Sequence, residues 1–127
     1  MDVLIRFGLT IEEIQNMTYT NEEILQVEDE ALNKLINILK DIGCSTNSIK
    51  NILLCNPFYL TSGVAATEGL IQMFKKLGFS SLYVLFDSNP YILNMSSMDL
   101  ENLYNQKIEE GLTKDEIINF VQNNMIF

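Results

Sequence analysis

Four lysines and one asparagine are the residues of this chain whose type and spacing best suit binding chemistry. A phosphate-binding patch would use them together, because phosphate contacts supply most non-specific affinity for nucleic acid and need several cations on one face. The alternative interpretation is that they are solvated helix ends and faces. The residues in question are Lys50, Asn51, Lys75, Lys76 and Lys107.

The charge of the chain argues against a general nucleic-acid binder. Its 127 residues carry 8 basic and 17 acidic side chains, for a net charge of −9. Such a balance disfavours non-specific contact with phosphate or with an anionic membrane. Only residues 43–77 are net basic, at +2, so any phosphate contact is expected in the middle of the chain.

Catalytic chemistry has little support in the sequence. There is no histidine, which removes the commonest general base and the commonest metal ligand. No serine or threonine lies beside a candidate base, and no glycine loop suits a phosphate. Cys44 and Cys55 lack a redox spacing and are expected to be buried free thiols. We therefore expect a protein without catalytic residues, metal or cofactor.

Two aromatic and three asparagine residues could bind a ligand by stacking or by hydrogen bonds from their amides. Phe58 and Tyr91 each follow one of the two prolines and could stack on single-stranded bases; the preferred interpretation is that they face the core. A further series lies eight residues past three of the glycines described next. Its members could form an amide ladder that binds a ligand, or could be ordinary exposed helix positions: Asn16, Asn51 and Asn119.

A repeat organises these residues. Glycines recur at intervals of 35, 35 and 33, and a leucine lies 18 residues before each of the last three. The phrase Asn-Pro-x-x-Leu occurs at 56–60 and 89–93, with degraded copies at 21–25 and 123–127. A fixed period in the thirties is typical of stacked repeats. The repeat-defining residues are Gly8, Gly43, Gly78, Gly111, Leu25, Leu60, Leu93, Pro57 and Pro90.

The physical chemistry of one repeat predicts two helices and a turn. Apolar stripes of helical period lie before Gly43, Gly78 and, less regularly, Gly111. Each glycine suits a left-handed helix end, and a Ser or Thr two residues later suits the start of a second helix. Second helices are expected at roughly 10–18, 45–55, 80–88 and 113–123. Proline then ends a helix and begins a short turn of 3-10 type.

We therefore predict one all-α domain over residues 1–127. Its architecture is an α-solenoid of about three to four helix-turn-helix repeats of period 33–35, with a 3-10 turn at each Asn-Pro corner. Glu22 and Asn124 replace proline in the outer copies, as expected for capping units.

The order of a long helix, a Leu-Gly-Phe-Ser junction at 77–80, a short helix and Pro-x-x-Leu resembles the mitochondrial transcription termination factor (mTERF) family. The resemblance implies a curved solenoid with two α-helices and a 3-10 turn in each unit. It also implies that nucleic acid is bound along a basic concave surface, whereas this chain contains a single arginine, Arg6.

Two function hypotheses follow. The first is a scaffold that binds a protein partner on the curved face of the stack, which the acidity and the missing catalytic set favour. The alternative is a DNA- or RNA-binding module of mTERF type that uses the lysines of the middle repeat. The end of the last helix, 124–127, could leave an apolar stack end that favours self-association. No leader or membrane-spanning run is visible, so the cytoplasm is the expected location.

Overall fold

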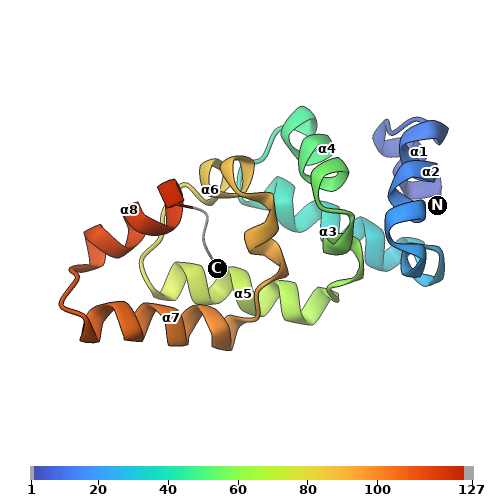
Figure 1. The fold of residues 1–127 in the computed structure, drawn as a ribbon. Coiled ribbons are helices and arrows are strands. Elements are labelled where there is room, and N and C mark those ends of the chain that lie inside the picture. Colours follow the sequence, from blue (N-terminus) through green and yellow to red (C-terminus); the bar gives the residue numbers. More distant parts are fainter. Residues whose placement is uncertain (1, 125–127) are drawn as a thin grey trace.

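The computed structural model describes residues 2–124, which form an elongated stack of helices (Figure 1). The chain advances from α1 and α2 at one end to α8 at the other, with α4, α6 and α8 along one side and α5 and α7 along the opposite side. None of the described helices is long and apolar enough to cross a membrane. The elements are α1 (Asp2–Phe7), α2 (Ile11–Thr20), η1 (Glu22–Gln26), α3 (Asp29–Asp41), α4 (Thr46–Cys55), η2 (Pro57–Thr61), α5 (Val64–Lys76), α6 (Leu82–Ser88), η3 (Pro90–Asn94), α7 (Ser97–Glu109) and α8 (Lys114–Asn124), where η marks a 3-10 helix.

Each repeat unit is a short helix, a 3-10 turn and a long helix. The first unit is α2–η1–α3, the second α4–η2–α5 and the third α6–η3–α7. The long helices α3, α5 and α7 pack in sequence order, and α4 packs against α6. The predicted all-α repeat architecture, including a 3-10 turn at each corner, is therefore confirmed.

Local sequence determines where the helices start and end. Gly43 adopts φ = +103°, and the amide of Cys44 closes the end of α3 by donating to Leu39 O at 3.1 Å. At the start of α2, the Thr10 hydroxyl accepts from the Glu13 amide while the Glu13 carboxylate accepts from the Thr10 amide. The four long-helix side chains Leu32, Leu35, Ile36 and Leu39 are buried on one stripe.

The glycines also lie where neighbouring units meet. A Cβ added to Gly8 would lie 2.8 Å from Nζ of Lys50, and one added to Gly43 would lie 3.2 Å from the ring of Tyr83. Lys50 belongs to α4 and Tyr83 to α6, so in each case the short helix of one unit covers the glycine that precedes the short helix of the unit before it. Both glycine positions therefore combine a helix end with a close contact between units.

The third unit departs from the predicted pattern at the start of its short helix. Ser80 is not the cap, because α6 begins at Leu82 after Ser81, which adopts φ = +52° and makes no side-chain cap bond. Asn89 lies only 11 positions after Gly78, whereas Asn56 lies 13 positions after Gly43. The missing residues shorten the helix to 7 residues from the 10 of α4, and a left-handed residue provides the entry.

Candidate interaction surface

A buried asparagine links each of the first two corners to the corner of the next unit. Asn56 is fully buried, and its Nδ2 donates to Pro90 O and to Asn94 Oδ1, both at 3.0 Å. Asn94 returns the bond by donating from its own Nδ2 to Asn56 Oδ1. One unit earlier, Asn21 Nδ2 donates to Pro57 O at 3.4 Å and to Thr61 Oγ1 at 2.9 Å.

Sequence reasoning missed this asparagine ladder. It assigned the corner to proline, although proline occurs in only two copies of the phrase and asparagine begins all four. The recurrence of asparagine was the signal in the sequence, because a residue that is kept where the proline is absent is expected to have a structural role of its own. Asn89 is also buried at the third corner. The fourth copy of the phrase includes residues 125–127, which lie outside the described part of the chain.

The three 3-10 turns form a row along one edge of the stack, and we call η1, η2 and η3 together the corner row. The middle turn contacts both of its neighbours. A 3-10 helix has three residues per turn, so residues three apart share a face. Pro57 and Leu60 accordingly lie on one buried face of η2.

Phe58 and Tyr91 therefore point outward, contrary to the expectation that they face the core. Phe58 is 48% exposed and Tyr91 is 60% exposed. Each lies off the face that proline shares with the leucine three residues on. The next residue of each turn, Tyr59 or Ile92, is buried together with that leucine, which leaves Phe58 and Tyr91 on the outer side. The two aromatic side chains occupy equivalent positions on neighbouring turns, which gives the corner row two exposed aromatic groups.

Burial and hydrogen bonds fix η2, the 3-10 turn that carries Phe58. Tyr59 is fully buried, and its hydroxyl donates to Leu35 O at 2.6 Å. Burial raises the pKa of Tyr59 far above its usual value, with a smaller contribution from Cys44. The Thr61 hydroxyl donates to Phe58 O at 3.2 Å. Phe58 is thus presented on a rigid turn.

The first turn of the row is acidic. Glu22 and Glu23 are exposed while Ile24 is buried, and Glu23 occupies the position of Phe58 and Tyr91. Leu25, the repeat equivalent of the buried Leu60 and Leu93, is 63% exposed. The reason is positional, because η2 packs on α2 and α3 of the preceding unit, whereas within residues 2–124 only the short α1 precedes the first unit.

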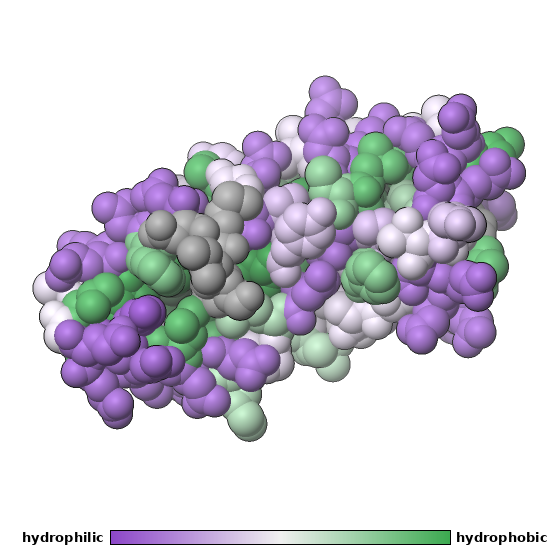
Figure 2. Space-filling model, in the orientation of Figure 1, coloured by the Kyte–Doolittle hydropathy of each residue, from purple (hydrophilic) through white to green (hydrophobic). Residues whose placement is uncertain are grey.

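The rest of the corner row is free of charged residues. Residues 51–67 and 88–98, which contain η2 and η3, include no Asp, Glu, Lys or Arg. The middle of the face in Figure 2, where Figure 1 places these two turns, is paler than the strongly hydrophilic ends. The corner row therefore combines an acidic end with a neutral, aromatic middle.

The four lysines that the sequence suggested as a phosphate-binding patch each lie beside different residues. Lys50 lies half-buried against Gly8. Lys76 Nζ lies 3.8 Å from Glu101 Oε2, and Lys107 Nζ lies 3.2 Å from Glu110 Oε2 and 4.9 Å from the Phe120 ring centroid. Lys75 is exposed in the last turn of α5. Two of the four positive charges are thus already paired with carboxylates.

The remaining amide and thiol positions divide between surface and core. Asn16, Asn51 and Asn119 are all exposed. Cys44 is buried, and desolvation, with a smaller effect of Asp87, raises the pKa of its thiol to about 11. Cys55 is exposed, which corrects the expectation that both thiols are buried; it ends α4 off the helix face formed by Ile49, Ile52 and Leu53.

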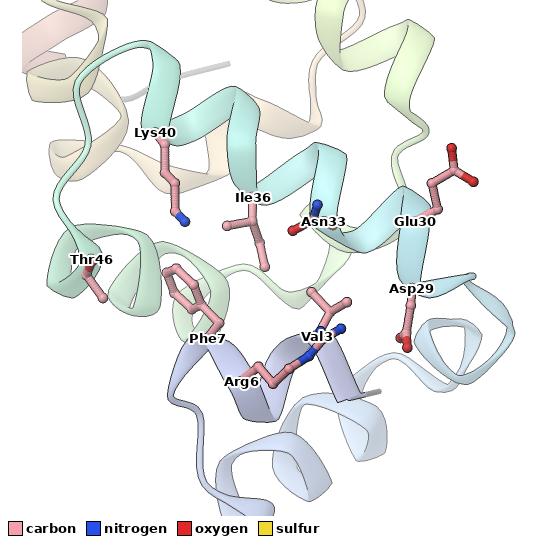
Figure 3. A pocket seen from close by; sticks show the side chains of 9 residues that line it. All are labelled: Val3, Arg6, Phe7, Asp29, Glu30, Asn33, Ile36, Lys40 and Thr46. Atoms are coloured by element: carbon pink, nitrogen blue, oxygen red, sulfur yellow. The ribbon is translucent and has the colours of Figure 1, made fainter.

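A cleft of about 510 Å³ lies at the N-terminal end of the stack, between α1, α3 and the start of α4 (Figure 3). Its charged side chains are of both signs, with Arg6 and Lys40 opposed by Asp29 and Glu30, and Lys40 Nζ lies 5.4 Å from the Phe7 ring centroid. Residues 2–124 contain no group of three carboxylate or thiol side chains that could hold a metal ion.

Comparison with known proteins gives one match. The model of the family described as mTERF matches residues 1–125. No curated protein and no solved structure matches the chain.

Proposed function

Because the chain belongs to the mTERF family of helical-repeat proteins, we propose that it is a non-enzymatic binding scaffold and that its corner row binds a segment of a partner protein. One observation carries the proposal. Phe58 and Tyr91 are exposed at equivalent positions of adjacent turns, in stretches without charged residues.

Protein interfaces favour this chemistry. Aromatic side chains are enriched among the residues that dominate binding, and charged residues are depleted at the centre of an interface. The turns that carry Phe58 and Tyr91 are tied to each other through Asn56, so little conformational freedom would be lost on binding.

Nucleic-acid binding in the manner of the family is the second candidate. Family membership favours it, and exposed aromatic groups can stack on single-stranded bases. The surface chemistry supports it less well, because Lys76 and Lys107 are paired with carboxylates and the chain carries a net charge of −9.

A selection from a random peptide library tests the first candidate. We expect the wild-type chain to enrich peptides that the double variant Phe58→Ser, Tyr91→Ser no longer binds. The control is Ile11→Ser, which removes an exposed apolar side chain (66% exposed) at the end of α2 that is remote from the corner row. Failure to enrich any peptide, or equal binding by the double variant, would refute the proposal.

Titration of a labelled single strand and a labelled duplex at low and at physiological salt tests the second candidate. Binding that weakens steeply with salt, and that is lost in Lys75→Glu, Lys76→Glu, would favour nucleic acid over a protein segment. The first candidate expects no such binding even at low salt, where electrostatic attraction is strongest.

We also propose that the protein self-associates through the C-terminal end of the stack. The proposed location is the cytoplasm. Residues 125–127, in the segment that the sequence suggested for this contact, lie outside the described part of the chain. Ile108 in the last turn of α7 is 44% exposed, which supports an apolar contact at that end. Light scattering over a range of protein concentrations measures it, and a monomeric mass at the highest concentration would rule it out.

A further inference from the structure

We propose that the corner row binds an extended segment of polyproline type that meets it with every third residue. Its apolar side chains would contact Phe58 and Tyr91, and a basic side chain would contact Glu23. This inference rests on the proposed function and names the class of ligand.

The spacing of the units is the first argument. The long helices α3, α5 and α7 pack directly on one another, and packed helices lie about 8–10 Å apart. Equivalent positions on η1, η2 and η3 therefore recur at about that interval. A polyproline helix advances about 3.1 Å per residue with three residues per turn, so its side chains return to the same face every ~9 Å. Successive same-face side chains of a β-strand are only about 7 Å apart.

The hydrogen-bonding groups are the second argument. A polyproline helix has no internal hydrogen bonds, so its carbonyls can accept bonds from a partner. The phenolic hydroxyl of Tyr91 belongs to a side chain that is 60% exposed and can donate to such a carbonyl. An α-helical ligand would match the spacing only at every seventh residue, and its carbonyls are already bonded within the helix.

Charge complementarity is the third argument. The position of Phe58 and Tyr91 is occupied by Glu23 in η1, and Glu22 is exposed beside it. A ligand in register with both aromatic groups would place its next same-face side chain near these carboxylates. A basic residue three positions from the nearer apolar one is the complementary choice.

The probe is a proline-rich peptide with arginine, leucine, leucine and arginine at intervals of three. Because an arginine stands at each end, one of them can contact Glu23 whichever way the peptide chain runs along the corner row. One comparison peptide has the same composition with its leucines two residues apart. A second is an alanine-rich helical peptide with its leucines seven apart. Fluorescence polarisation measures binding of the labelled peptides to the whole chain.

The first peptide is expected to bind about tenfold more tightly than either comparison peptide, and Phe58→Ala or Tyr91→Ala to weaken it about tenfold. Glu23→Gln should weaken it about threefold and reduce its dependence on salt, as expected for one exposed ion pair. Ile11→Ala should leave the affinity unchanged. Circular dichroism establishes that each variant keeps its helices.

Equal binding of the three peptides, or undiminished binding by the aromatic variants, would overturn the inference. So would failure of all three probes while library-selected peptides still require Phe58 and Tyr91, and that outcome would leave the proposed function standing. If the library yields no peptide either, the inference and the proposed function fall together.

Discussion

At the scale of the residue, the asparagine of the corner has a role that its proline cannot fill. Proline supplies a fixed backbone angle and removes a donor, which ends the short helix within its own unit. The asparagine amide reaches the next unit instead, where Asn56 bonds to Pro90 O and Asn94. The first corner keeps the asparagine without the proline, and Asn21 is still buried and bonded.

Replacing Asn56 with alanine should therefore lower the free energy of unfolding by about 1–2 kcal/mol, because the half-buried Pro90 O loses its donor, whereas the exposed Asn94 amide can bond to water. Urea denaturation measures the change. Asn51→Ala in α4, the helix that Asn56 follows, is the matched control, since Asn51 is exposed and its loss should cost less than about 0.5 kcal/mol. Equal effects of the two substitutions would contradict the ladder as a source of stability.

Alkaline pH should destabilise the protein through Cys44. Its thiol pKa is raised from 9.0 to about 11 in the folded state, so above pH 9 the unfolded chain releases a proton that the folded chain retains. The free energy of unfolding should therefore be constant below about pH 9 and fall as pH rises toward 11. Tyr59 acts in the same direction at higher pH, because its folded pKa is also raised.

Urea denaturation at several pH values between 8 and 11, under reducing conditions, measures this fall. Cys44→Ala should make it shallower, whereas Cys55→Ala, at an exposed thiol, should not change its slope. An identical slope in all three proteins would show that Cys44 does not carry the effect.

At the scale of the element, sequence pattern predicted more of the helices than of the turns. Helical stripes and glycines predicted the C-terminal ends of α3 and α5 to within two residues, because many buried contacts select one face of a long helix and Gly43 and Gly78 end it. A five-residue turn offers no such repetition. The sequence predicted the 3-10 turn but not which of its side chains are buried, and the outward position of Phe58 follows from the burial of Pro57, Tyr59 and Leu60. The candidate surface was therefore the part that the sequence predicted wrongly.

A substitution at Ser81, the residue before α6, should stabilise the protein. Its left-handed conformation, φ = +52°, costs a non-glycine residue about 1–2 kcal/mol, and no side-chain cap bond offsets that cost. Glycine loses about 0.5–1 kcal/mol more backbone entropy on folding, so Ser81→Gly should raise the free energy of unfolding by up to about 1.5 kcal/mol.

Ser80→Gly is the control, because Ser81 is the one non-glycine residue with positive φ between residues 2 and 124. In Ser80→Gly the greater backbone freedom of glycine relieves no strain, so the free energy of unfolding should fall. Thermal and urea denaturation of both variants measure the two effects. A loss of stability in Ser81→Gly would show that its conformation carries no cost here.

At the scale of the whole molecule, the stack is unevenly buried along its length. The long helices α3 and α5 each bury four side chains on their stripe, whereas α7 buries only Leu100. Glu110, at the end of α7, occupies the position of Ile42 and Leu77 in the earlier units. In a solenoid each unit contacts chiefly its neighbours, so stability is close to a sum of local terms. The C-terminal unit should open first.

Amide hydrogen exchange can resolve this gradient, because it measures the free energy of opening at each helix. We expect the slowest-exchanging amides of α3 and α5 to require a larger opening free energy than those of α7 and α8. Leu100→Ala should remove about 3 kcal/mol from the protection of α7 and α8, because it deletes the buried anchor of α7. The amides of α3 and α4, two units away, should be little affected.

Leu35→Ala is the matched central substitution. Leu35 is 1% exposed within α3, which packs on both α1 and α5, so its loss should lower protection in the units on either side. If Leu100→Ala instead lowered protection uniformly from α2 to α8, the units would unfold together. In that case the corner bonds would couple the ends of the stack more strongly than nearest-neighbour packing requires, and a ligand held along η1, η2 and η3 would stabilise every helix equally.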